Sequence, residues 1–193
     1  MRVLSSTSPS LMRVRLSQQL IGVRTTDAVS FIDLTSHIQK YVEISHVQHG
    51  SVTLFSRHTT AAIKLNEAEE LLLEDFKATL FRLCPVGKRY HHNDMSRRKP
   101  PVQPNERENG HSHCMQLLLP TSETIPIIES KLALGTWQRI FLVELDGPRE
   151  REILVQLVDF IPARPRKQLL KITSPRTIDN RKDMLACFKC YRR

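Results

Sequence analysis

The chain has 193 residues, which is enough for one ordinary domain, and its 40% of hydrophobic residues predict a buried core. No apolar run approaches the roughly 20 residues that cross a bilayer, which excludes helical membrane spans. Four cysteines are too few for a disulfide scaffold in a chain of this length, so we expect a reducing, cytoplasmic environment.

The net charge of +9 is concentrated at the C-terminal end. Residues 161–193 contain ten Lys and Arg against two Asp and so carry +8 of this charge. The body of the protein is therefore nearly neutral. We expect residues 162–193 to form a basic, poorly ordered tail, through which nucleic acid could be bound without sequence preference.

Two interpretations fit the N-terminal segment. Residues 1–26 hold four arginines and no acidic residue, a composition that resembles a mitochondrial transit peptide. Val14 and Leu16 alternate with polar residues, which predicts a first strand instead. We expect a flexible segment over residues 1–13 and one domain over residues 14–161.

Hydrophobic periodicity predicts two helices among strands in the first 85 residues. Thr35 is a suitable N-cap, and Ile38 and Val42 follow at helical spacing. Asn66 precedes a second helix, which ends before Pro85. Strands are predicted around these helices, at residues 31–34, 51–56 and 61–65.

A long polar segment follows at residues 85–112. It is rich in Pro, Arg, Asn and His, and loops of this length in compact domains usually carry function or are disordered. Strands are predicted to resume at residues 114–119, 124–128, 136–145 and 152–161. The order of elements predicts an α+β domain with a mostly antiparallel sheet.

The first two histidine motifs are Arg57–Thr60 and Tyr90–Asp94. In the first, His58 stands beside two hydroxyls, which offers a ring nitrogen and two adaptable donors. In the second, extended backbone would point His91 and His92 to opposite faces, so only one of them should reach a site. Each motif alone fits a turn or a solvated loop equally well.

The third histidine motif, Asn109–Cys114, is predicted to enter a strand. His111 and His113 would then share a face, and this spacing can present two imidazoles to one metal ion. Cys114 is expected to be a small core residue, as is Cys84. Cys187 and Cys190 form a CxxC without a second ligand pair.

A charged turn, Glu144–Arg151, supplies the fourth motif. Arg149 and Arg151 flank the turn, and paired guanidinium groups suit phosphate or carboxylate because each binds two oxygens. An exposed charged hairpin is the alternative reading. The chain has no Gly-rich phosphate loop, GxSxG elbow or HExxH motif.

Taken in chain order, these motifs resemble the YjbQ family, whose members are often described as secondary thiamine-phosphate synthases. The resemblance covers roughly residues 14–161. It is carried by GSVTLFSRHTTAAIKLNE at residues 50–67, YHHND at 90–94, NGHSH at 109–113, LGTWQ at 134–138 and ELDGPRER at 144–151.

This resemblance implies two packed, mostly antiparallel β-sheets with two main helices, and a homotrimer with a polar site near the subunit interface. The recurrent histidines of the family fall on His58, His92 and His113, which become the candidate catalytic residues and candidate ligands of a divalent metal such as Zn or Mg. The residues expected to bind substrate or phosphate are Thr59, Thr60, Asn66, Glu67, Asn109, Arg149 and Arg151.

The implied reaction joins an aminopyrimidine diphosphate to a thiazole phosphate and releases pyrophosphate. Two alternatives stay open: a metal-dependent hydrolase of a phosphorylated metabolite, and a non-enzymatic trimer that binds an anionic metabolite. One departure from the family stands at His111, where many relatives have an acidic residue.

Overall fold

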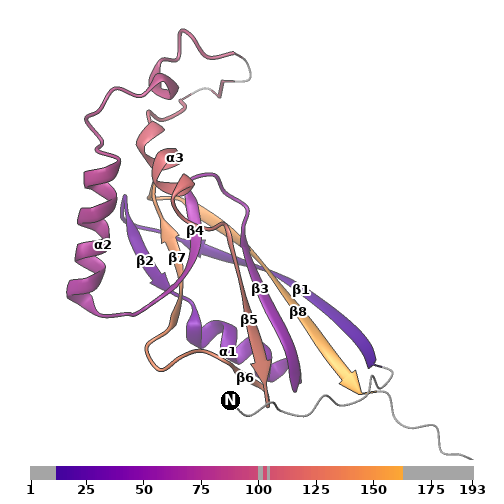
Figure 1. Cartoon of the computed structure of the whole chain (residues 1–193). Coiled ribbons are helices and arrows are strands. Elements are labelled where there is room, and N and C mark those ends of the chain that lie inside the picture. The colour runs from indigo at the N-terminus through magenta and orange to yellow at the C-terminus, as the bar shows by residue number, and fades with distance from the viewer. Residues whose placement is uncertain (1–11, 100–101, 104, 163–193) are drawn as a thin grey trace, which may run out of the picture. The chain divides into compact units, whose positions relative to one another are not determined.

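The computed structural model describes residues 12–162, except 100, 101 and 104 (Figure 1). Of the predicted flexible N-terminus (1–13) and basic tail (162–193), residues 1–11 and 163–193, with Cys187 and Cys190, lie outside this part, whereas Met12, Arg13 and Pro162 belong to strands. The elements in chain order are β1 (Met12–Arg24), β2 (Ser30–Asp33), α1 (Thr35–Ile44), β3 (His49–Ser56), β4 (Ala61–Asn66), α2 (Glu70–Leu83), the 3₁₀ helix η1 (His91–Asn93), α3 (Gly110–Leu117), β5 (Ser122–Ile128), β6 (Lys131–Leu132), β7 (Arg139–Glu144) and β8 (Glu150–Pro162).

The strands form two antiparallel sheets, which confirms the predicted α+β class. The larger sheet has the order β1-β8-β3-β5-β6, and the smaller sheet has the order β2-β7-β4. β1 pairs with β8 over its whole length, from Met12 opposite Pro162 to Arg24 opposite Glu150. Residues 12–24 are therefore a strand, as the alternation of Val14 and Leu16 predicts.

The smaller sheet is buried on both faces, so it forms the middle layer. Alternate residues of a strand point to opposite faces, and β7 is apolar on each. Ile140 and Leu142 pack into a cluster shared with α1 and the larger sheet. Phe141 and Val143 pack into a second cluster that contains Leu80 of α2. β7 is consequently held from both sides up to Glu144, where the polar motif begins.

The first two helices begin close to where the sequence predicts them, with different caps. In α1 the N-cap position is Leu34, and the Thr35 hydroxyl instead accepts a hydrogen bond from Ile140 N–H at 2.9 Å. In α2 the N-cap is Glu69, whose carboxylate accepts from two backbone N–H groups at 3.0 and 2.8 Å. Asn66 therefore does not cap α2. None of the helices described is long and apolar enough to cross a membrane.

The prediction of a strand at residues 114–119 is wrong, because residues 110–117 form the helix α3. Tertiary contacts account for the difference. A Cβ atom at Gly110 would lie 2.6 Å from Tyr90 Cβ, so glycine lets the helix begin against that ring. Ser112 and Met115 then turn inward and are fully buried. Helices this short are marginal in isolation, so packing determines this one.

Candidate functional site

A cavity of about 620 Å³ lies where β3 and β7 end and where β4 and β8 begin. α3 and the segment before it complete its wall. Eight residues predicted for the site line this cavity, namely His58, Thr59, Thr60, His92, Asn109, His113, Arg149 and Arg151. The other lining residues are Arg57, Arg98, Gln103, Asn105, Glu106 and Arg107.

Asn66 and Glu67 do not line this cavity. Asn66 is the last residue of β4, five residues beyond Ala61, and Glu67 follows it, while strands rise about 3.3 Å per residue. The Asn66 side chain accepts a hydrogen bond from Glu67 N–H at 2.9 Å, which is a local turn contact. The structure thus separates these two predicted binding residues from the cavity by roughly the length of the strand.

His58 is fixed to the backbone of β8. Its Nε2 accepts a hydrogen bond from Glu152 N–H at 2.7 Å, so in the neutral ring the proton is assigned to Nδ1. Burial lowers the pKa of His58, and the Arg151 charge lowers it further. His58 is therefore a neutral imidazole near pH 7, with Nε2 already engaged. It is better suited to donate a hydrogen bond through Nδ1 than to act as a base.

His92 and His113 form a pair on the opposite side of the cavity. Their ring centroids are 4.6 Å apart with an edge-to-face angle of 63°. Burial lowers the pKa of His113, and His92 lowers it further. His113 is consequently neutral near pH 7 and can accept or donate a proton.

The expectation that His111 and His113 share a face is wrong. Residues two apart in a helix point about 200° away from each other, whereas in a strand they would align. His111 instead lies near Tyr90, with ring centroids 6.3 Å apart, and its buried Nδ1 has no hydrogen-bond partner. His91 is exposed, as predicted, although η1 rather than extended backbone separates it from His92.

The three histidines predicted to bind a metal are not placed around one point. Among the residues that the structure describes, no three His, Cys, Asp or Glu side chains are placed to hold a metal ion. His92 and His113 are adjacent, but His58 is bound to the β8 backbone. The described residues therefore do not fit the predicted three-histidine site for Zn or Mg.

Arg151 makes a buried ion pair rather than an open phosphate contact. Its Nε donates to Glu144 Oε2 at 2.6 Å, and its Nη2 donates to Glu144 Oε1 and to the Thr60 hydroxyl at 3.0 Å. Arg151 is 4% exposed and Glu144 is fully buried. The Glu144 carboxylate also accepts from the Thr25 hydroxyl and the Asp146 N–H. Arg151 and Thr60 therefore support the cavity wall.

Asp146 is shared by two arginines at the edge of the cavity. Arg149 donates to its carboxylate at 2.5 Å, and an Arg107 nitrogen lies 3.9 Å from the other oxygen. Arg107 also donates to the Asp146 carbonyl at 3.0 Å. Asn109 donates its amide N–H to the same carboxylate at 2.8 Å, which fixes this buried acid. Both guanidinium groups are partly exposed.

The ion pairs of the cavity leave one cation without a carboxylate of its own. Three arginines are paired one to one: Arg57 with Glu152, Arg98 with Glu106 and Arg151 with Glu144. Arg107 and Arg149 share Asp146. Among the described lining residues, the uncompensated positive charge therefore lies between these two.

Several of these residues were not predicted for the site. Arg57 stands next to a motif histidine, and Arg98, Glu106 and Arg107 come from the polar segment at residues 85–112. The composition of that segment indicated function, but it has no periodicity from which side-chain directions could be inferred. The charged-turn motif also contains Glu144 and Asp146, for which the sequence predicts no role.

Anion affinity should rise as the pH falls. The pKa values of His58 and His113 are lowered, so both rings are neutral at pH 7.5 and gain charge only below their ordinary value of 6.5. A second positive charge a few ångströms from an anion stabilises it by about 1–4 kcal/mol. We expect sulfate, whose own charge is constant here, to bind about tenfold more tightly at pH 5.5 than at pH 7.5, measured by calorimetry.

The matched control is the triple variant His58→Gln, His92→Gln, His113→Gln, which removes every histidine described as lining the cavity. It should show a nearly flat dependence of sulfate affinity on pH over the same range. A wild-type affinity that does not change between pH 7.5 and 5.5 would show that none of these rings faces the bound anion.

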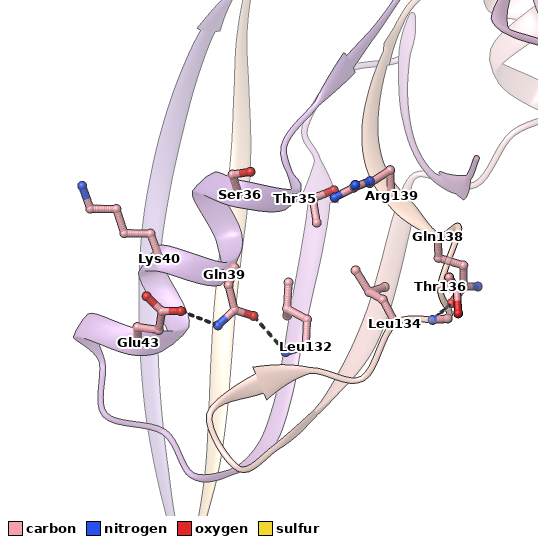
Figure 2. Close-up of a pocket in the computed structure, with 11 residues that line it drawn as sticks. Thr35, Ser36, Gln39, Lys40, Glu43, Leu132, Leu134, Thr136, Gln138 and Arg139 are labelled. Carbon is pink, nitrogen blue, oxygen red and sulfur yellow. Dashed lines mark hydrogen bonds between the residues drawn. The ribbon is translucent and has the colours of Figure 1, made fainter. Parts of the chain in front are cut away.

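A second cavity, of about 570 Å³, lies at the other end of the smaller sheet, between α1 and the segment that joins β6 to β7 (Figure 2). Gln39 bridges its two sides, donating to Glu43 at 2.8 Å and accepting from Leu132 N–H at 3.0 Å. The Gln138 side chain closes the LGTWQ turn by accepting from Gly135 N–H at 2.8 Å. Its charged lining residues are Lys40, Glu43 and Arg139, and no histidine is among the residues described as lining it.

Comparison with known proteins agrees with this architecture. The family model "UPF0047 protein YjbQ-like" matches residues 19–159. A UPF0047 protein of Methanothermobacter thermautotrophicus is 40% identical over 139 residues, which cover 72% of this chain and 90% of that protein. One from Archaeoglobus fulgidus is 37% identical, with coverages of 70% and 97%.

Solved structures are similar over the same region. A YbjQ-like protein of unknown function from Sulfolobus solfataricus aligns with a TM-score of 0.68 and 33% identity, covering 76% of this chain and 99% of the other. A UPF0047 protein from Clostridium acetobutylicum aligns with a TM-score of 0.63 and 33% identity, covering 72% and 98%. The chain therefore belongs to the YjbQ-like UPF0047 family.

Proposed function

We propose that this protein is an enzyme for a small phosphorylated metabolite, in which Arg107 and Arg149 bind the phosphate and His113 transfers a proton. The observation that carries the proposal is the sharing of Asp146 by the two arginines in a cavity that also holds the neutral His113. Guanidinium groups that share one carboxylate keep N–H donors for phosphate oxygens. A neutral imidazole is suited to general acid–base catalysis near pH 7.

The resemblance to thiamine-phosphate synthases gives this proposal a specific reaction. The thiazole nitrogen would form a bond to the methylene carbon of the aminopyrimidine diphosphate. The C–O bond to the diphosphate would break, and its electron pair would leave with pyrophosphate. Arg107 and Arg149 would stabilise that departing charge. A divalent ion that accompanies the diphosphate would belong to the substrate.

The test is to incubate purified protein with both thiamine precursors, with and without Mg²⁺, and to measure thiamine phosphate. A parallel assay measures phosphate released from phosphate monoesters, since hydrolysis is the enzymatic alternative. In the phosphate-release assay, where a general base would activate water, we expect His113→Gln to lose about 10²–10⁴-fold, and the variant should bind sulfate within about threefold of wild type at pH 7.5. Wild-type activity in that variant would remove His113 from the mechanism.

We further propose that the protein is a cytoplasmic homotrimer that uses the outer face of the larger sheet. On β1 and β8 this face carries apolar side chains in register: exposed Val14 lies opposite exposed Phe160, and exposed Leu16 lies opposite the partly buried Val158. Leu20 and Phe55 extend it. Contiguous apolar surface of this kind is typical of protein interfaces.

The variant Leu16→Glu should reduce the assembly to single chains. Light scattering after gel filtration should then give 22.3 kDa instead of three times that mass. The matched control is Leu71→Glu on α2, where the leucine is 68% exposed compared with 57% for Leu16. An unchanged mass in Leu16→Glu, or the same loss in both variants, would place the interface elsewhere.

A further inference from the structure

The cavity that holds His113 and Arg149 has a lining that indicates the chemical class of the ligand beyond its phosphate group. None of its fourteen described lining residues has an aliphatic side chain or a hydrocarbon ring. They are arginines, histidines, threonines, asparagines, a glutamine and one glutamate. Most small-molecule pockets are lined mainly by hydrophobic and aromatic side chains, so this lining is unusually polar and favours a ligand rich in hydrogen-bonding groups. The rings of His92 and His113 pack edge to face and are not parallel, so they do not form a common stacking platform.

One carboxylate within this cationic cavity is informative. Glu106 is ionised, because hydrogen bonds from Arg98 and from Gln103 N–H hold its pKa below the usual range. An anionic side chain repels a phosphate, but it accepts hydrogen bonds from hydroxyl groups. Each of its oxygens has two lone pairs, and the contacts in the structure use one on each. Glu106 therefore favours a ligand that brings O–H donors to this side.

The remaining polar groups suit the same chemistry. Gln103 and Asn105 contribute amides, Thr59 contributes a hydroxyl, and His58 has its Nδ1–H left to donate. Such groups pair with hydroxyls, which both donate and accept. A heteroaromatic ring would offer these groups fewer hydrogen-bond partners than a chain of hydroxyls.

We propose that the ligand is a phosphorylated polyol of the sugar-phosphate class, with its phosphate at Arg107 and Arg149 and its hydroxyls facing Glu106. This inference rests on the phosphate site proposed above. The single uncompensated cation of the cavity matches one phosphate group. Thiamine precursors would then be secondary substrates.

The experiment compares ligands of equal phosphate charge by calorimetry on the full-length protein. Ribose 5-phosphate and glycerol 3-phosphate are set against phenyl phosphate and a phosphorylated aminopyrimidine, with orthophosphate as the reference. The expected result is that ribose 5-phosphate binds at least tenfold more tightly than phenyl phosphate and orthophosphate. Equal or tighter binding of the aromatic esters would overturn the polyol assignment.

The variant Glu106→Gln separates the hydroxyl contact from the phosphate contact. It should weaken ribose 5-phosphate about fivefold and leave orthophosphate unchanged or tighter, because a negative charge is removed. A parallel weakening of both ligands would overturn the assignment of Glu106 to hydroxyls. If the aromatic esters bind more tightly than ribose 5-phosphate, but orthophosphate binding is still weakened by loss of Arg107 and Arg149, only the polyol assignment is wrong. If orthophosphate and every ester fail to bind, the proposed function fails as well.

Discussion

Removal of the Glu144 carboxylate should lower the free energy of unfolding more than any surface substitution does. We expect Glu144→Ala to lower the free energy of unfolding by about 3–5 kcal/mol, because it leaves the Arg151 charge buried without a partner. Urea denaturation followed by circular dichroism measures the loss. Domains of this size are stable by only about 5–15 kcal/mol, so much of the margin would disappear.

Glu152→Gln is the matched control, since Glu152 pairs with Arg57 at 3.0 Å but both side chains are at least half exposed. We expect a change of about 0–1 kcal/mol there. If Glu144→Ala is too unstable to purify, the double replacement Glu144→Met, Arg151→Met should recover part of the loss, because no lone charge remains. A double variant as unstable as the sum of its parts would argue against the coupling of the pair.

The pH dependence of stability follows from the same carboxylate. Burial alone would raise the pKa of Glu144, but the hydrogen bonds from Arg151 and from Asp146 N–H outweigh it, so the pKa lies below the ordinary 4.5. The folded state thus binds this proton less readily than the unfolded chain. The stabilisation is present above pH 4.5 and is lost as the pH falls through the lowered value. The free energy of unfolding of Glu144→Gln should accordingly fall less steeply than that of the wild type as the pH is lowered.

The second large effect is expected at the shared anion site. Arg107→Gln with Arg149→Gln should weaken sulfate or phosphate-ester binding about 100-fold, because hydrogen bonds to charged groups contribute about 1.5–3 kcal/mol each. Calorimetry at pH 7.5 measures the change. Asp146→Asn should act in the opposite direction and tighten binding, since it removes the competing negative charge from the two arginines.

Arg57→Gln is the control for this pair. Arg57 lines the same cavity, but Glu152 neutralises it one to one, so its loss should change sulfate affinity by no more than about threefold. A loss as large as that of the Arg107 and Arg149 variant would show that the anion is not located by the shared carboxylate.

Much of the fold could be predicted because local pattern and tertiary structure agree there. The alternation around Val14 predicts β1, and the helical spacing of Ile38 and Val42 predicts α1. The strand prediction failed at residues 114–119 because the contact of Gly110 with Tyr90 and the burial of Met115 decide that segment. Such long-range contacts leave no periodic signal in eight residues.

The sequence predicts the residue types of the site, but it does not predict which partner each side chain binds. The fork of Arg151 was expected to bind phosphate or carboxylate, and it binds the carboxylate of Glu144, seven residues earlier in the same motif. Which partner a guanidinium takes depends on the pairing of β7 and β8 through the turn, which spacing alone does not give. Asn66 belongs to the family pattern, yet its strand places it at the far end of the sheet.

Asp146 also has a consequence for how ligands enter and leave. Its carboxylate holds the guanidinium of Arg149 and stands opposite that of Arg107 before any ligand arrives, so these cations are already ordered. An anion at the proposed site would lie beside a carboxylate that Asn109 holds in place, so repulsion from Asp146 would offset part of the attraction of the two arginines. The affinity of the proposed site is thereby limited from within. Such a site would favour rapid release over tight retention.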